Sequence, residues 1–108
     1  MSEAETQGRL LSALGLCMKA GGVICGVPMI CDAMRKGGKK SPIIVLEAAD
    51  TSENTHKKIT DKCGFYGVRR VRMSCTADDL AAALGKSSAL GAVAITDAGL
   101  CRLIEKYI

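Results

Sequence analysis

The sequence predicts an α/β protein in which helices cover both faces of one largely parallel or mixed sheet. Segments with a helical spacing of apolar residues alternate with short apolar runs, in the order α-β-α-β-α-β-α-β-α. A chain of 108 residues, 48% of them hydrophobic, has room for one domain with a substantial core. No linker, low-complexity tract or internal repeat interrupts the pattern. We therefore expect a single domain over residues 1–108, with residues 1–5 frayed.

Start and stop signals place the elements along the chain. Pro28 suits the first turn of a helix, where the amide that proline lacks would have no partner. Asp50 with Glu53, and Thr76 with Asp79, have the spacing of capping boxes. Glycines follow the apolar stripes and end the helices. The expected helices are residues 6–20, 28–36, 50–66, 76–84 and 97–107, and the expected strands are residues 23–25, 42–46, 68–73 and 90–96.

The periodicity of apolar residues predicts which of these elements are helices and which are strands. Leu10, Leu14 and Cys17 recur at helical spacing in the first segment. The continuous apolar run at residues 42–46 is typical of a strand that is covered on both faces. The last segment, residues 97–107, has the amphipathic pattern of a helix that packs on one side.

Composition limits the classes of function. Fifteen Lys and Arg against eleven Asp and Glu give a net charge of +4, which permits a polyanionic partner without requiring one. The aromatic residues are only Phe65, Tyr66 and Tyr107, so an RNA partner would be held mainly through phosphates, base edges and shape. No apolar run approaches the roughly 18–20 residues of a membrane span, and the acidic start is unlike a signal peptide. We expect a cytoplasmic protein.

No catalytic or metal site is predicted, and no cofactor is expected. His56 is the only imidazole, and its charged surroundings indicate an exposed helix residue. Glycine-rich phosphate loops of the known spacings are absent from the sequence. The cysteines lack zinc-site or redox spacing and several lie in apolar runs, so we interpret them as reduced, buried side chains. An enzyme that uses one activated cysteine is kept as an alternative. The six cysteines are Cys17, Cys25, Cys31, Cys63, Cys75 and Cys101.

Basic residues form three clusters. The cluster at residues 35–40 joins the end of a helix to a glycine-containing turn, where lysines can neutralise phosphates and release about 0.7–0.9 counterions each. The cluster at residues 69–72 is interpreted as a solvated face of a strand. A third cluster, on the helix at residues 50–66, consists of Lys57, Lys58 and Lys62.

Ordered segments along the chain resemble the L7Ae/L30e ribosomal-protein family, and the resemblance is closest to its small bacterial members of the YlxQ type. It runs from about residue 10 to the C-terminus, and it lies in the order and spacing of the pieces together. These pieces are Leu11, Leu14, Cys17, residues 19–21, Gly26, and residues 33–39, 44–55, 57–59, 61–63, 80–86 and 93–99.

The resemblance implies a three-layer α/β/α sandwich with a four-stranded mixed sheet that binds structured RNA, typically kink-turns. In this family a Gly-x-Asn-Glu-x-x-Lys segment at the start of the second helix grips the RNA. Here Gly26 matches the leading glycine, where a positive φ is expected. Pro28, Met29 and Asp32 stand in place of Asn, Glu and Lys. The first two lack side-chain donors for base edges, and the third repels phosphates.

These matches predict a non-enzymatic RNA-binding protein, with the ribosome as a further expected partner and with neither a membrane nor a small-molecule substrate. The loop before the last strand, which packs against a flipped-out nucleotide in the family, corresponds to residues 86–88. The alternative is a protein-interaction module that keeps the fold and has lost kink-turn recognition. The candidate RNA-binding residues are Gly26, Val27, Pro28, Met29, Lys36, Lys39, Lys40, Lys86, Ser87 and Ser88.

Overall fold

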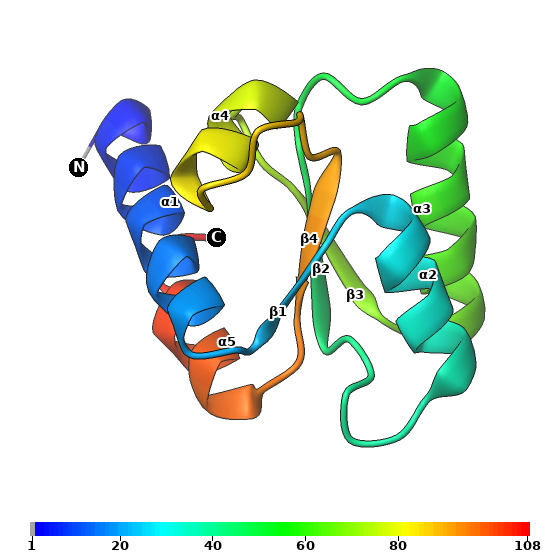
Figure 1. Cartoon of the computed structure of the whole chain (residues 1–108). Coiled ribbons are helices and arrows are strands. Elements are labelled where there is room, and N and C mark those ends of the chain that lie inside the picture. Colours follow the sequence, from blue (N-terminus) through cyan, green and yellow to red (C-terminus); the bar gives the residue numbers. More distant parts are fainter. Residues whose placement is uncertain (1) are drawn as a thin grey trace.

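A four-stranded mixed sheet lies between two layers of helices in the computed structural model, which describes residues 2–108 (Figure 1). The helices are α1 (Glu3–Lys19), α2 (Val27–Lys36), α3 (Glu53–Tyr66), α4 (Ala77–Ala83) and α5 (Ala98–Glu105). The strands are β1 (Val23–Cys25), β2 (Ile44–Glu47), β3 (Arg69–Arg72) and β4 (Ala92–Ile95). Their order in the sheet is β1-β4-β2-β3, with β2 and β3 parallel and the other two pairs antiparallel. The predicted three-layer α/β/α fold is confirmed.

Successive side chains of the central strands point to opposite faces of the sheet, so the hydrophobic core consists of two clusters, one on each face. Ile44 and Leu46 of β2 pack toward α1, α4 and α5, whereas Val45 packs toward α2 and α3 (Figure 1). On β4, the face toward α2 and α3 carries only Ala92 and Ala94, and these small side chains leave room for the two helices to lie close to the sheet. Because β2 and β4 are covered on both faces, all of their residues are buried. The apolar run predicted this correctly for residues 44–46, whereas Ile43 of the same run lies before the strand and is 43% exposed.

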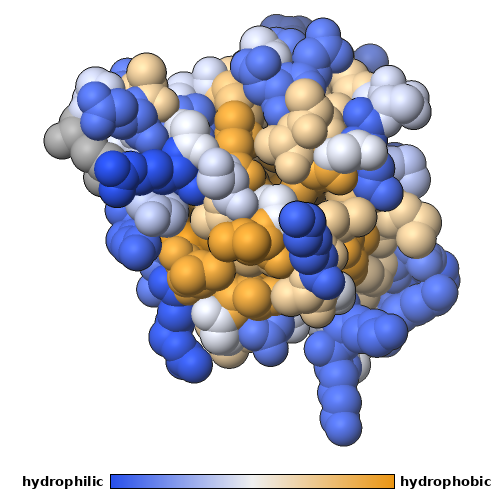
Figure 2. Space-filling view, turned by 60° about the vertical axis from the view of Figure 1, so that its left-hand side comes forward, coloured by the Kyte–Doolittle hydropathy of each residue, from blue (hydrophilic) through white to orange (hydrophobic). Residues whose placement is uncertain are grey.

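The α1 and α5 layer leaves an apolar hollow open to solvent. Leu16 and Leu103 are exposed in it, and Figure 2 shows apolar side chains gathered on this face among hydrophilic neighbours. Its volume is about 550 Å³.

Two helix starts differ from the prediction by three residues, and the other three differ by one. The helix expected from residue 6 begins at Glu3, because the Ser2 side chain accepts the Glu5 amide at 3.2 Å; Met1 lies outside the described residues. The start assigned to Asp50 is wrong, because Ser52 caps α3. Asp50 instead accepts the first amide of α4, that of Ala77, at 2.7 Å. The capping box that opens α4 is confirmed.

Candidate nucleic-acid interface

The start of α2 presents free backbone donors to solvent. Gly26 has the predicted positive φ, at 91°, which allows its amide to donate to the Ala92 carbonyl at 3.0 Å while the helix turns away from the sheet. No side chain caps this end, and its first turn holds no acidic residue. The amides of Val27 and Met29 have no partner within residues 2–108, and Pro28 contributes no amide. Two donors and the positive end of the helix dipole are therefore open to an anion.

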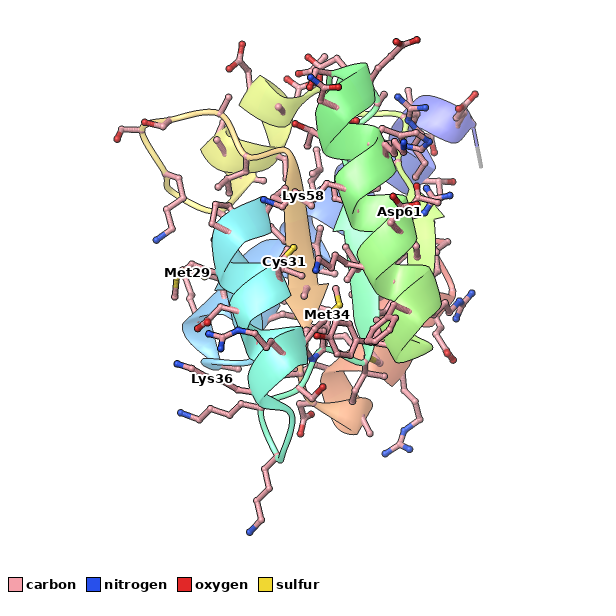
Figure 3. The ribbon with its side chains drawn as sticks, turned by 90° about the vertical axis from the view of Figure 1, so that its right-hand side faces the viewer. Met29, Cys31, Met34, Lys36, Lys58 and Asp61 are labelled. Atoms are coloured by element: carbon pink, nitrogen blue, oxygen red, sulfur yellow. The ribbon has the colours of Figure 1, made fainter. Side chains whose placement is uncertain are left out.

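The loop before β4 lies beside this helix start, as Figures 1 and 3 show. A Cβ on Gly91 would lie 3.7 Å from Cγ2 of Val27. The amide of Gly26 also donates to the carbonyl of Ala92, which directly follows this loop, at 3.0 Å. The structure therefore places the loop that contains the exposed residues 86–88 alongside residues 26–29, although the two segments are 57 or more positions apart along the chain.

The other three candidate lysines lie at the opposite end of α2, about 15 Å away for a helix of ten residues. Lys36 and Lys40 line a groove of about 310 Å³ that runs along α2 to Met29. Lys39 lines a neighbouring hollow with Gly22 and Asp97. The ten candidate residues thus form two groups, connected by the exposed face of α2 on the Met29 side.

Asp32 sits between these two groups and is paired. Arg35 Nη2 donates to Asp32 Oδ1 at 2.5 Å, and Lys36 Nζ lies 3.1 Å from Oδ2. The hydrogen bond from Arg35, followed by that from Lys36, lowers the pKa of the Asp32 carboxyl. The carboxylate that the sequence suggested would repel phosphates is thus partly neutralised, and Lys36 is partly occupied.

A second groove, of about 340 Å³, lies between α2 and α3 and was missed by the sequence analysis. Figure 3 looks onto these two helices. The available signal was the spacing of Lys58, Lys62 and Tyr66 at i, i+4 and i+8, which places all three on one side of a helix. The groove is lined by Pro28, Cys31, Asp32, Arg35, Lys58, Lys62 and Tyr66.

A buried carboxylate stands under the start of α3. Glu47 of β2 is completely buried and accepts hydrogen bonds from Thr51 Oγ1 at 2.5 Å and Arg70 Nη1 at 3.1 Å. His56 Nδ1 lies 2.8 Å from Glu47 Oε2 and must carry a proton there, because a carboxylate only accepts. Burial by itself raises the pKa of Glu47, but the hydrogen bonds from Thr51 and His56 and the charges of His56 and Arg70 outweigh it, so the pKa is lowered.

This network corrects two sequence interpretations. His56 is half-buried and holds Glu47, so the expected exposed helix residue is wrong. The cluster at residues 69–72 is not simply a solvated face, since Arg70 pairs with Glu47 and Arg72 donates to the Ala49 carbonyl at 2.9 Å. Only the pairing of β2 with β3 brings these partners together.

Four of the six cysteines are buried, as the sequence predicts, and two are not. Cys25 and Cys31 are half-buried rather than buried. Burial raises the pKa of the thiols of Cys17, Cys25, Cys63, Cys75 and Cys101, which is the opposite of the change that activates a cysteine. Within residues 2–108 no three His, Cys, Asp or Glu side chains gather into a metal site, and no helix there is long and apolar enough to span a membrane. The buried cysteines are Cys17, Cys63, Cys75 and Cys101.

The α/β/α sandwich and the glycine-led start of α2 define the class of protein. Residues 9–104 match the model of the ribosomal protein L7Ae/L30e/S12e/Gadd45 family, and the chain belongs to this family. Among individual proteins, it is 36% identical to the RNA-binding protein YlxQ of Bacillus subtilis over 86 residues, which cover 80% of this chain and 81% of the relative. It is 38% identical to the RNA-binding protein YlxQ of Enterococcus faecium over 68 residues, covering 63% and 62% of the two chains.

Two solved structures share the fold. A protein of unknown function from Bacillus halodurans superposes with a TM-score of 0.78 at 28% identity, covering 91% of this chain and 94% of that one. The Giardia lamblia 15.5kD RNA binding protein superposes with a TM-score of 0.73, covering 95% and 84%. At 17% identity, the second likeness concerns the fold alone.

Proposed function

We propose that this chain binds structured, kink-turn-like RNA at the start of α2 and the adjoining loop of residues 86–88. The observation that carries the proposal is the open first turn of α2, where the amides of Val27 and Met29 are free and no acidic residue is present, with the end of the loop that contains Lys86 in contact with the start of the helix. Backbone donors at a helix start bind phosphates. The relatives from Bacillus subtilis and Enterococcus faecium, which are named RNA-binding proteins, support the same conclusion.

Shape and backbone contacts carry recognition in this proposal. Pro28 and Met29 have no side-chain donor for a base edge, so the contacts left to this turn are amides to phosphates and the 62% exposed Met29 against an unstacked base. Lys36, Lys39 and Lys40 then hold a second stretch of backbone further along α2. Association with the ribosome and a cytoplasmic location stay predictions.

Titration with two RNAs tests the proposal. A kink-turn RNA and an unbent duplex of equal length are compared at about 50 and about 200 mM salt. We expect the kink-turn RNA to bind more tightly than roughly 10 µM at the lower salt and more tightly than the duplex. Absence of binding at that concentration would remove the proposal, and equal affinity for both RNAs would remove the kink-turn part of it.

A triple variant locates the interface. Replacing Lys36, Lys39 and Lys40 by Ala should weaken binding and reduce the steepness of log affinity against log salt by about 2–3, from roughly 0.7–0.9 for each of three phosphate contacts. The control is Arg102→Ala in α5 with Lys106→Ala at its C-cap, which removes two charges from the other helix layer and should leave affinity nearly unchanged. Unchanged affinity in the triple variant would mean that the RNA lies on another face.

A protein-interaction module is the second candidate, and the apolar pair Pro28 and Met29 favours it. Both side chains are exposed at the head of α2, and methionine is common on adaptable protein-binding surfaces. A stable protein complex that survives nuclease treatment, together with the absence of kink-turn binding, would select this function.

A further inference from the structure

We propose that the groove between α2 and α3 holds a single-stranded RNA segment that leaves the folded RNA bound at the start of α2. This inference rests on the proposed function, because it extends the same RNA from the first turn of α2 along a second surface. The occupant is identified by the charge, the aromatic end and the width of the groove.

Two facing stripes of side chains form the walls of the groove. From α3 come Lys58, Lys62 and Tyr66, one turn apart, and from α2 come Pro28 and Arg35 at its two ends. Ile30, Met34, Ile59 and Cys63 pack beneath them and hold the two helices together. The groove is therefore a preformed feature of this helix layer.

The lining is cationic. Lys58 and Lys62 make no ion pair within residues 2–108, and Arg35 shares the single lining carboxylate, Asp32, with Lys36. Three cations thus face one carboxylate in the groove. Figure 3 shows Lys58 pointing from α3 toward the first turn of α2, while Asp61 points to the side of α3 away from it. Charge complementarity selects a polyanion.

An exposed aromatic pair, Phe65 and Tyr66, lies at the end of the groove that is far from the first turn of α2. Tyr66 lines the groove, and the adjacent Phe65 is 81% exposed, with its ring 4.9 Å from that of Tyr66 in an edge-to-face arrangement. Unpaired bases stack on such rings, whereas paired bases inside a duplex present no free face. Neighbouring helices lie about 8–10 Å apart, too close to admit a duplex between their side chains. These features favour a single strand.

The groove continues directly from the proposed interface. Pro28 belongs to the first turn of α2 and also lines the groove. Figures 1 and 3 show α2 and α3 running side by side in the same direction, so Lys58 lies near the RNA-binding end and Tyr66 at the other. One turn of helix advances about 5–6 Å and the whole of α2 about 15 Å, which matches about four stacked nucleotides at about 3.4 Å each.

The experiment compares one kink-turn RNA in three forms: blunt, with a 5′ extension, and with a 3′ extension, each extension of about six unpaired nucleotides. We expect the protein to bind one extended form about tenfold more tightly than the blunt form at about 50 mM salt. The variant Lys58→Ala with Lys62→Ala should lose this gain and keep its affinity for blunt RNA. The control Arg102→Ala with Lys106→Ala removes the same charge from α5 and its C-cap and should keep the gain in affinity.

Two further measurements distinguish the phosphate contacts of the lysines from base stacking on the aromatic pair. Two phosphate contacts at about 0.7 counterions each make the gain fall about sevenfold between about 50 and about 200 mM salt. Phe65→Ser should lower the gain without changing this salt dependence, because stacking releases no counterions. Circular dichroism of each variant checks that the fold is kept.

Each outcome decides between the two proposals. Blunt and extended RNAs bound equally by the unaltered protein would overturn the groove proposal and leave the proposed function standing. Loss of blunt-RNA affinity in the Lys58 and Lys62 variant would also overturn it, since these lysines would then belong to the first interface. Failure of the unaltered protein to bind blunt RNA would overturn the proposed function itself.

Discussion

Replacing Glu47 by Gln tests whether the buried network under α3 stabilises the fold. The substitution keeps the shape of the side chain and removes the charge that Thr51, His56 and Arg70 hold. Gln also turns a donor toward two donating groups, because its amide nitrogen cannot accept a hydrogen bond. Hydrogen bonds to a charged group contribute about 1.5–3 kcal/mol each, but Arg70 and His56 are 28% and 35% exposed and regain water.

We therefore expect the free energy of unfolding to fall by about 2–3 kcal/mol, and the melting temperature by roughly 10 °C or more for a domain of this size. Urea unfolding at neutral pH, with an unchanged m-value, measures the first quantity. The matched control is Glu105→Gln, which removes the ion pair with Arg69 at 3.4 Å, where both side chains are 54% exposed. It should cost less than about 0.5 kcal/mol. Equal stability of the two variants would refute this account of Glu47.

The pH dependence of stability tests independently whether the ionised form of Glu47 stabilises the fold. The pKa of Glu47 is lowered in the folded state, so its stabilisation is fully present above the unfolded pKa of about 4.3 and is lost as the pH falls through the folded pKa. The difference in unfolding free energy between the unaltered chain and the Glu47→Gln variant should therefore narrow below about pH 4. A difference that stays constant down to about pH 2 would mean that the carboxylate charge is not its source.

Two further substitutions test the start of α2. Gly26→Ala should cost about 1–3 kcal/mol of stability and weaken RNA binding. The cause is backbone strain at a φ of 91°, and a steric clash does not contribute, because no atom lies within 4 Å of the added Cβ. The control is Gly8→Ala, because Gly8 lies within α1 and a Cβ there has open space. This substitution should stabilise the fold by about 0.5–1 kcal/mol in thermal unfolding. Similar changes in stability for the Gly26 and Gly8 variants would contradict the argument from backbone strain. Met29→Glu with Asp32→Lys should strengthen kink-turn binding and raise the salt slope by about 0.7–0.9, and weaker binding in a titration would show that the family motif is misplaced on this chain.

Local signals predicted most of the fold. The glycines after α2 and the capping box of Thr76 with Asp79 depend on neighbours within a few residues, so the sequence contains the required information. The positive φ of Gly26 was expected from the family resemblance. The candidate residues at the start of α2 came from the family resemblance. The structure places the loop that contains Lys86 beside them, and it places Lys36, Lys39 and Lys40 at or just after the other end of the helix.

The alternation of helices and strands, the glycine turns and the apolar content were determined by the sequence itself, because each depends on residues in the same turn or strand. Only the tertiary structure decided what the polar side chains do. Asp50 accepts the first amide of α4, the helix that Thr76 caps, and does not cap α3. Glu47 binds His56 and Arg70 because sheet pairing brings together strands that are distant along the chain. The α2 and α3 groove has the same origin: its two lines of charge lie on separate helices, and packing on one face of the sheet makes them a single surface.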